Sequence, residues 1–280
     1  MRTSRMHLLW PVIWLGGLCG LLTWDSLFLN GPAFTQLRTA FANTLLAGAI
    51  VVVLSTLLGW AAGAALHLLE TRRRFLYLGV TFILNIIRSI PQIVGILGAY
   101  VLLTILIQYE VVQSRPAQLV WIACSITLFV FLEVADLVRE RIRYYETLDF
   151  YPAMLCCGIR EGRIINREII WKNSRAHLLR KMISILGVAI FLQCSIDFVV
   201  SVGLSTDVSL SNFPVTLGSL LAKLDSKQDI LAIGSVLLNP LQGPTLLFEH
   251  LQGISVAFLI VFTLLCVYKI SNGLVKRYNL

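Results

Sequence analysis

The sequence predicts an all-α integral membrane protein with six transmembrane helices, and its composition, hydropathy and charge distribution all favour this class. Hydrophobic residues make up 57% of the 280-residue chain and charged residues only 14%, whereas soluble domains average roughly 45–50% apolar and about 25% charged residues. The mean hydropathy is +0.81. This composition excludes a water-soluble core, a disordered chain and a small disulfide scaffold.

Six stretches have the length and apolar character to cross a bilayer, which requires about 20 residues. The first follows Arg2 and Arg5 and has no small-residue cleavage site, so we interpret it as a retained span rather than a signal peptide. Residues 1–40 are expected to hold this span and an outer loop, and residues 41–280 the main transmembrane domain, with an inner connection at 136–181. The predicted spans are Leu8–Trp24, Phe41–Leu69, Pro91–Ile107, Leu119–Ala135, Ile183–Leu204 and Leu251–Tyr268.

A break is predicted before the third span. As one straight helix, Phe75–Ile107 would reach about 50 Å, which is too long for one crossing. Pro91 lacks an N–H group and disfavours helix in the residue before it. We therefore expect an interfacial or partly inserted helix over Phe75–Ile87, a break after Arg88, and a span that begins at about Pro91.

The basic residues predict the orientation. If both termini are cytoplasmic, the inner segments hold 19 Lys and Arg residues and the outer loops hold 4, which fits the excess of positive charge in cytoplasmic loops. The long outer loop Ser205–His250 includes the uncharged stretch Ile230–Phe248, which two turn dipeptides, Asn-Pro and Gly-Pro, interrupt. We interpret that stretch as a surface or re-entrant segment, because a seventh span would place Lys276 and Arg277 outside.

Sequence motifs for catalysis are missing. The chain has no Gly-Lys dipeptide and so no phosphate-binding loop of the Gly-Lys-Ser/Thr type, and its four histidines have no partner at metal-ligand spacing. We therefore expect no enzyme activity, cofactor or metal in this chain. If ATP drives its function, another chain must hydrolyse it.

The inner connection Asp136–Lys181 is the most informative segment. Its 46 residues far exceed what a turn between neighbouring helices needs. Its apolar positions predict a short amphipathic helix near Pro152–Gly158 and then a second helical stretch. Such a segment is either a solvated basic loop beside lipid headgroups or a docking element for a cytoplasmic partner.

Four polar residues lie in or at the ends of apolar spans, where such groups are costly and usually face a bundle interior or water. Glu133 lies near a span end and is expected to be interfacial. Gln193 and Asp197 are four residues apart and share one helix face; Asp197 lies about 21 Å into its span. We expect this face, with Asn43, to line a translocation pathway or to contact a paired subunit.

Several motifs together carry a resemblance to a known family. The connection places Ala153 and Gly158 at the spacing of a Glu-Ala-Ala, three residues, Gly pattern, with Pro152 and Met154 in the variable places, and Glu168–Trp171 follows at the spacing of its Ile-x-Leu-Pro half. This loop resembles the signature of binding-protein-dependent ABC transporter permeases of the MetI-like superfamily. Supporting motifs occur at Asn43-Thr44-Leu45, Arg88-Ser89-Ile90-Pro91, Asp197–Leu204, Pro214–Gly218 and Asn272–Arg277.

The resemblance implies a six-helix permease fold in the bacterial inner (plasma) membrane, with a cytoplasmic coupling helix and a long outer loop before the last helix. It is greatest to the second permease subunit of dipeptide, oligopeptide and nickel transporters, and it implies movement of peptides or a related small solute by alternating access. The implied partners are a second permease, two ATPase subunits that bind ATP and Mg, and an extracytoplasmic solute-binding protein, with no nucleic acid. The implied coupling residues are Pro152, Ala153, Met154, Gly158, Arg160 and Glu161, and the candidate pathway residues are Asn43, Gln193 and Asp197.

Other interpretations stay open. The segment Arg88–Pro91 also fits permeases of the methionine, phosphonate or amino-acid branches. A secondary transporter or a non-transporting membrane scaffold belongs to a different class. A secondary transporter should show repeated halves and membrane-embedded charge relays, for which Asp197 is the only candidate in this sequence.

Overall fold

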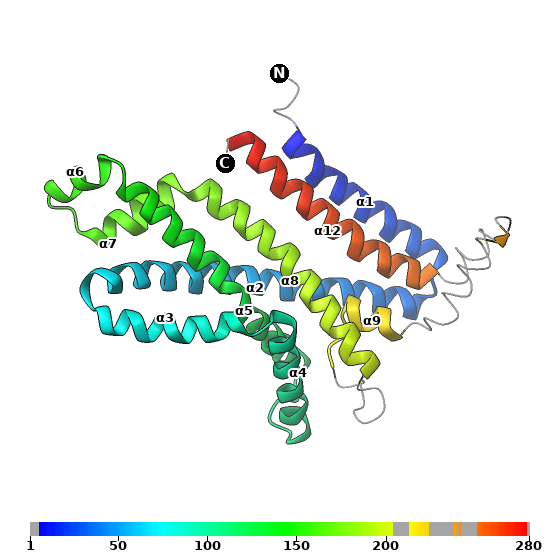
Figure 1. Cartoon of the computed structure of the whole chain (residues 1–280). Coiled ribbons are helices and arrows are strands. Elements are labelled where there is room, and N and C mark those ends of the chain that lie inside the picture. Colours follow the sequence, from blue (N-terminus) through cyan, green and yellow to red (C-terminus); the bar gives the residue numbers. More distant parts are fainter. Residues whose placement is uncertain (1–5, 204–212, 224–237, 240, 242–250, 279–280) are drawn as a thin grey trace.

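The computed structural model describes residues 6–203, 213–223, 238–239, 241 and 251–278. Every regular element in this described part is helical. Long helices pack side by side, and short helices lie toward both ends of the molecule (Figure 1). The helices are α1 (Met6–Phe28), α2 (Gly31–Arg72), α3 (Arg74–Ser89), α4 (Gln92–Gln108), α5 (Arg115–Glu146), α6 (Phe150–Cys156), α7 (Glu161–Arg163), the π-helix η2 (Ile164–Asn173), α8 (Arg175–Gly203), α9 (Leu217–Lys223) and α12 (Leu251–Tyr278).

Among the described helices, α1, α2, α5, α8 and α12 are long and apolar enough to cross a membrane. The number of candidate spans rises from five to six if α3 and α4 together form one bent span. By helix length and hydropathy the chain is therefore a multi-pass membrane protein, and the predicted all-helical membrane class is confirmed at that level. Most of the expected outer loop Ser205–His250, including most of Ile230–Phe248, lies outside the described residues.

The first connection differs from the expected outer loop. α1 continues to Phe28 and α2 already begins at Gly31, so residues 31–40 are helical. Pro32 lies in the first turn of α2, where its missing N–H group costs no helical hydrogen bond. Leu37 and Ala40 are fully buried against side chains of α1, α8, α9 and α12. Tertiary packing therefore extends α2 beyond the apolar stretch that the sequence marks.

The predicted break before the third span is confirmed. α3 ends at Ser89, Ile90 is extended with φ −83° and ψ 123°, and Pro91 precedes α4. The axes of α3 and α4 differ by 89°. Proline forces this geometry because its ring clashes with a helical residue before it. Arg88, in the last turn of α3, forms an ion pair with Asp136 of α5 at the bend.

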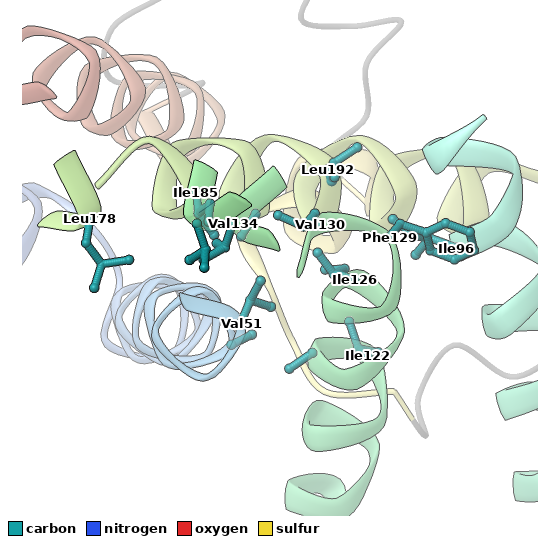
Figure 2. Close-up of a cluster of buried hydrophobic side chains, with 14 of the residues drawn as sticks. Val51, Ile96, Ile122, Ile126, Phe129, Val130, Val134, Leu178, Ile185 and Leu192 are labelled. Atoms are coloured by element: carbon teal, nitrogen blue, oxygen red, sulfur yellow. The ribbon is translucent and has the colours of Figure 1, made fainter. Parts of the chain in front are cut away.

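The core lies where α2, α4, α5 and α8 meet (Figure 2). Two glycines of α2 allow close contact with α5. A Cβ atom at Gly59 would lie 2.4 Å from Val134 Cβ, and one at Gly63 would lie 2.8 Å from the carbonyl oxygen of Ala135. Small residues four apart let two helix backbones approach in this way. The pair α2–α5 is therefore the central packing unit of the described structure.

α1 packs along α12 at one edge of the molecule (Figure 1). Trp14 Nε1 donates to Thr263 Oγ1 at 3.3 Å, and Ser255 Oγ donates to Asp25 Oδ1 at 2.7 Å. These contacts join segments from the two ends of the sequence.

Candidate functional site

The connection between α5 and α8 is a folded unit rather than an open loop. α5 does not end near residue 135, as the sequence suggested, but continues to Glu146. It leads to the short helix α6, which lies at one end of the molecule (Figure 1). The helix predicted near Pro152–Gly158 is present as Phe150–Cys156.

Gly158 terminates α6. Its φ is +77°, a left-handed conformation that glycine adopts without steric cost. The Gly158 N–H donates to the carbonyl of Leu155 at 2.9 Å, and the Ile159 N–H donates to that of Met154 at 3.2 Å. This pair of bonds is the Schellman helix end, with Met154 and Ile159 both packed on the core. A Cβ atom at Gly158 would meet no atom within 4 Å, so its backbone conformation, not crowding, requires glycine.

The six residues that the family resemblance implies for coupling lie together around α6. Met154 and Glu161 are half-buried. The side chains that form the outer surface of α6 and its end are exposed: Pro152, Ala153, Leu155, Cys156, Cys157, Gly158 and, beyond it, Arg160.

η2 anchors this unit to the helices behind it. Ile164, Ile165, Ile169 and Ile170 are all at most 2% exposed. In an α-helix residues five apart lie on different faces, whereas the i to i+5 bonding of a π-helix brings them closer to one face. Trp60 of α2 stacks on Trp171, with ring centroids 6.1 Å apart, and donates to a side-chain oxygen of η2 at 2.7 Å.

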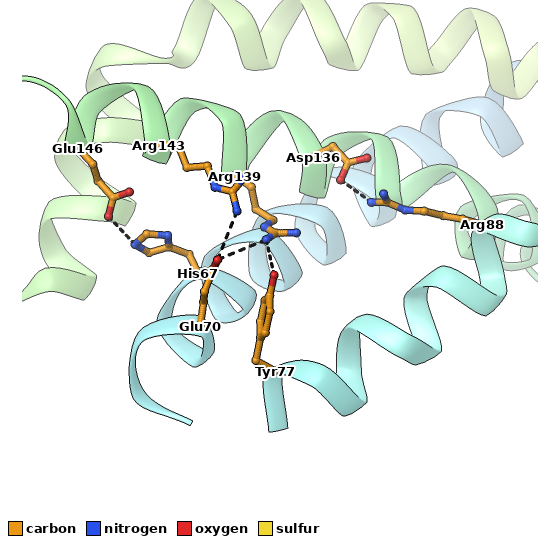
Figure 3. A network of polar contacts seen from close by, with 8 residues as sticks. All are labelled: His67, Glu70, Tyr77, Arg88, Asp136, Arg139, Arg143 and Glu146. Atoms are coloured by element: carbon orange, nitrogen blue, oxygen red, sulfur yellow. Dashed lines mark hydrogen bonds and ion pairs between the residues drawn. The ribbon is translucent and has the colours of Figure 1, made fainter. Parts of the chain in front are cut away.

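A polar network ties α2 and α3 to α5 beside this unit (Figure 3). Glu70 at the end of α2 accepts from Arg139 and Arg143 of α5, each at 3.4 Å. Arg139 also donates to the Tyr77 hydroxyl of α3 at 3.0 Å. His67 Nε2 lies 3.0 Å from a carboxylate oxygen of Glu146. The sequence analysis missed these residues, although their charges at the ends of apolar stretches were a usable signal.

Tyr151 joins α6 to this network. Its side chain is buried, and its hydroxyl donates to Glu161 at 3.4 Å. Burial, with the nearby carboxylates of Glu161 and Glu146, raises the pKa of Tyr151 to about 12. The hydroxyl therefore keeps its proton, and its donor role, throughout the physiological pH range.

A second cluster of polar residues is buried near the far end of α8. Asp197, 5% exposed, accepts hydrogen bonds from the hydroxyls of Tyr100 in α4 and Thr216 before α9, the latter at 2.6 Å. Asp197 was expected to face a pathway or a paired subunit, and the structure gives it two partners in its own chain. Thr216 also accepts from the Ser219 N–H at 3.2 Å, so the cluster fixes the start of α9.

The other two candidate pathway residues, Asn43 and Gln193, lie on α2 and α8. Asn43 of α2 donates to the carbonyl of Val215 at 2.8 Å, and Thr44 accepts from the Leu217 N–H at 3.0 Å. Gln193 is fully buried, and neither atom of its amide has a hydrogen-bond partner among the described residues.

α9 lies in direct backbone contact with α8. A Cβ atom at Gly218 would lie 2.4 Å from the carbonyl oxygen of Cys194. Gly218 is the glycine of the Pro214–Gly218 motif, so close approach of two backbones explains its residue type.

Comparison with known proteins adds no relative to this geometry: no family model matches the chain, and no curated protein matches it.

Proposed function

We propose that this chain is a transmembrane permease subunit of an ATP-driven ABC transporter, and that α6 is its docking element for an ATPase subunit. The observation that carries the proposal is a short helix with an exposed outer surface on a buried, anchored base. The outer surface includes Ala153 and Cys156. On its other side α6 packs on α5, and the connection that follows α6 is anchored by the buried isoleucines of η2. A solvated loop beside lipid headgroups would need no such base.

In this proposal the chain transmits motion and does not hydrolyse ATP. ATP and Mg bind to two partner ATPase subunits. Closure of that pair moves α6, and the continuous helix α5 carries the movement to the membrane part of the molecule. A second permease completes the pathway, and a solute-binding protein delivers peptides or a related small solute from outside.

The buried amide of Gln193 supports a pathway role for this residue in the moving complex. Its amide is buried without a hydrogen-bond partner among the described residues, and an unpaired buried amide is costly. Separation of α8 from its neighbours during alternating access would let water or solute pair with it. Asn43 and Asp197 would then position the helices that flank the pathway.

The test is retention of the ATPase by an exposed variant of α6. In Ala153→Trp the added bulk stands on the exposed surface and leaves the backbone unstrained, so we expect the ATPase subunits no longer to copurify with the complex and transport to be lost. The control is Asn173→Trp, which places the same side chain at an exposed position of η2. Normal copurification and transport in Ala153→Trp would contradict the proposal.

Native thiols give a second readout. Cys156 and Cys157 are exposed on and next to α6, so a bound ATPase should protect them from a water-soluble maleimide. Removal of the ATPase by washing should restore labelling. Equal labelling with and without the ATPase would place the docking element elsewhere.

A further inference from the structure

A groove of about 610 Å³ lies between α5, α8 and α12. Its lining changes from polar to apolar along α8: His177 and Arg180 come first, Ser184 follows, and Val188 and Phe191 come last. α12 runs antiparallel to α8 (Figure 1) and touches it where Val267 meets Gly187. The polar lining residues of α12, Ser271 and Asn272, therefore lie toward the polar end of the groove, and Leu264 of the same helix lies toward the apolar end.

The polar end of the groove is positively charged. None of the described residues that line it is acidic. Lys181 is already paired, with its Nζ 2.7 Å from Glu133 Oε2. Arg180 has no ion pair with any residue in the described part of the chain, so its guanidinium group is available to an external anion.

The groove crosses the level at which the apolar part of α8 begins. The 15 residues after Lys181, Met182–Ile196, carry no charge and would extend about 22 Å. Arg180 therefore lies where headgroups meet hydrocarbon. Tyr268, 62% exposed, flanks the groove, and tyrosine is enriched at this interface. Phe191, 52% exposed, opens the apolar end toward the surroundings.

We propose that this groove binds an anionic phospholipid. The phosphate pairs with Arg180, whose planar guanidinium can form two parallel bonds to phosphate oxygens, and Asn272 and Ser271 supply further hydrogen-bonding groups. One acyl chain lies along Val188 and Phe191. Basic grooves between membrane helices are suited to such headgroups. The proposal needs only the membrane location of the chain and is independent of ABC transport.

The experiment measures lipid retention by the full chain in mild detergent, using native mass spectrometry. The probes are phosphatidylglycerol and phosphatidylcholine with identical acyl chains. We expect the wild type to retain phosphatidylglycerol preferentially, and Arg180→Gln to weaken that binding roughly tenfold, the usual effect of losing a charge-assisted contact. Arg175→Gln is the matched control, because Arg175 is exposed on the same helix outside the groove, and it should bind like the wild type.

Two further binding measurements distinguish a bound lipid from a free anion. Ser184→Trp fills the middle of the groove and keeps Arg180, so it should also lose phosphatidylglycerol, while millimolar inorganic phosphate should not displace the lipid. Displacement by inorganic phosphate, with normal binding by Ser184→Trp, would identify a free-anion site and overturn the proposal. Equal retention of both lipids, or equal loss in Arg175→Gln and Arg180→Gln, would overturn it as well. Each variant is compared after its gel-filtration profile matches the wild type.

Discussion

At the scale of single residues, Asp197 shows why a polar group is kept inside an apolar helix. Its carboxyl group accepts from Tyr100 and Thr216, which come from two different elements. Replacing it with Leu removes both acceptors and leaves the buried Tyr100 hydroxyl unpaired, while the Thr216 hydroxyl keeps its hydrogen bonds to Ser219. We expect Asp197→Leu to lower stability by about 1–3 kcal/mol, measured by thermal unfolding in detergent.

Two comparisons make that prediction specific. Asp197→Asn keeps one acceptor oxygen and should cost less, while Phe198→Leu, at the exposed neighbouring position, should change little. If Asp197→Leu unfolds at the wild-type temperature, the two hydrogen bonds do not fix α9. A transport defect in Asp197→Asn with an intact complex would add a pathway role.

Gly158 makes a second prediction at this scale. Its positive φ costs about 1–2 kcal/mol for a residue with a side chain, and Asn tolerates that conformation better than Ala does. Gly158→Ala should therefore loosen the end of α6 more than Gly158→Asn. Trypsin cleavage at the exposed Arg160 and Arg163 should be faster in Gly158→Ala. Identical cleavage rates in the two variants would count against a strained helix end.

At the scale of elements, the contact of α2 with α5 depends on two glycines. Gly59→Leu or Gly63→Leu would drive a side chain into Val134 or the backbone at Ala135. Overpacking of this kind typically costs 1–3 kcal/mol or more. Gly79→Leu on α3 is the control, because a Cβ atom there meets nothing within 4 Å. A lowered unfolding temperature for the first two variants and not for the control is the expected result.

The sequence predicted elements well where a single local rule decides them. Pro91 alone determines the break between α3 and α4, and unbroken apolar stretches mark the five long helices. The sequence-based prediction was wrong where packing between distant segments determines the structure. Residues 31–40 were expected in an outer loop, but they are helical because Leu37 and Ala40 are buried against other helices. The π-helix was not foreseen either, although the pattern Ile164, Ile165, Ile169, Ile170 has the spacing of five that favours it.

The sequence also predicted part of the candidate site, again where a local pattern determines the structure. The short helix at 150–156 follows from local amphipathic spacing and from its terminating glycine. The hydrogen-bond partners of Asp197 could not be deduced, because Tyr100 and Thr216 are 97 and 19 residues away and no local pattern pairs them. The close approach at Gly59 and Gly63 was open to prediction, since small residues four apart on an apolar helix signal it.

At the scale of the whole molecule, the charge distribution predicts which connections face the cytoplasm. Asn30, between α1 and α2, and Asn173, at the end of η2, are both exposed and are expected on opposite sides. In a variant whose Cys156 and Cys157 are replaced by Ser, Asn30→Cys should react with an impermeant maleimide on intact cells. Asn173→Cys should react only after permeabilisation. The reverse pattern would invert the orientation, and labelling of both from outside would exclude the six-span arrangement.

The pairing of α1 with α12 also has a consequence for biosynthesis. Asp25 is fully buried, and its partner Ser255 is 230 residues further along the chain. When α1 leaves the ribosome, α12 has not been made, so for most of translation this carboxyl group lacks the hydroxyl that it meets in the finished protein. An acidic group is costly in hydrocarbon, so we expect α1 to settle into its final contacts only once α12 is present. The hydrogen bond between Ser255 and Asp25 can form only after α12 has been synthesised.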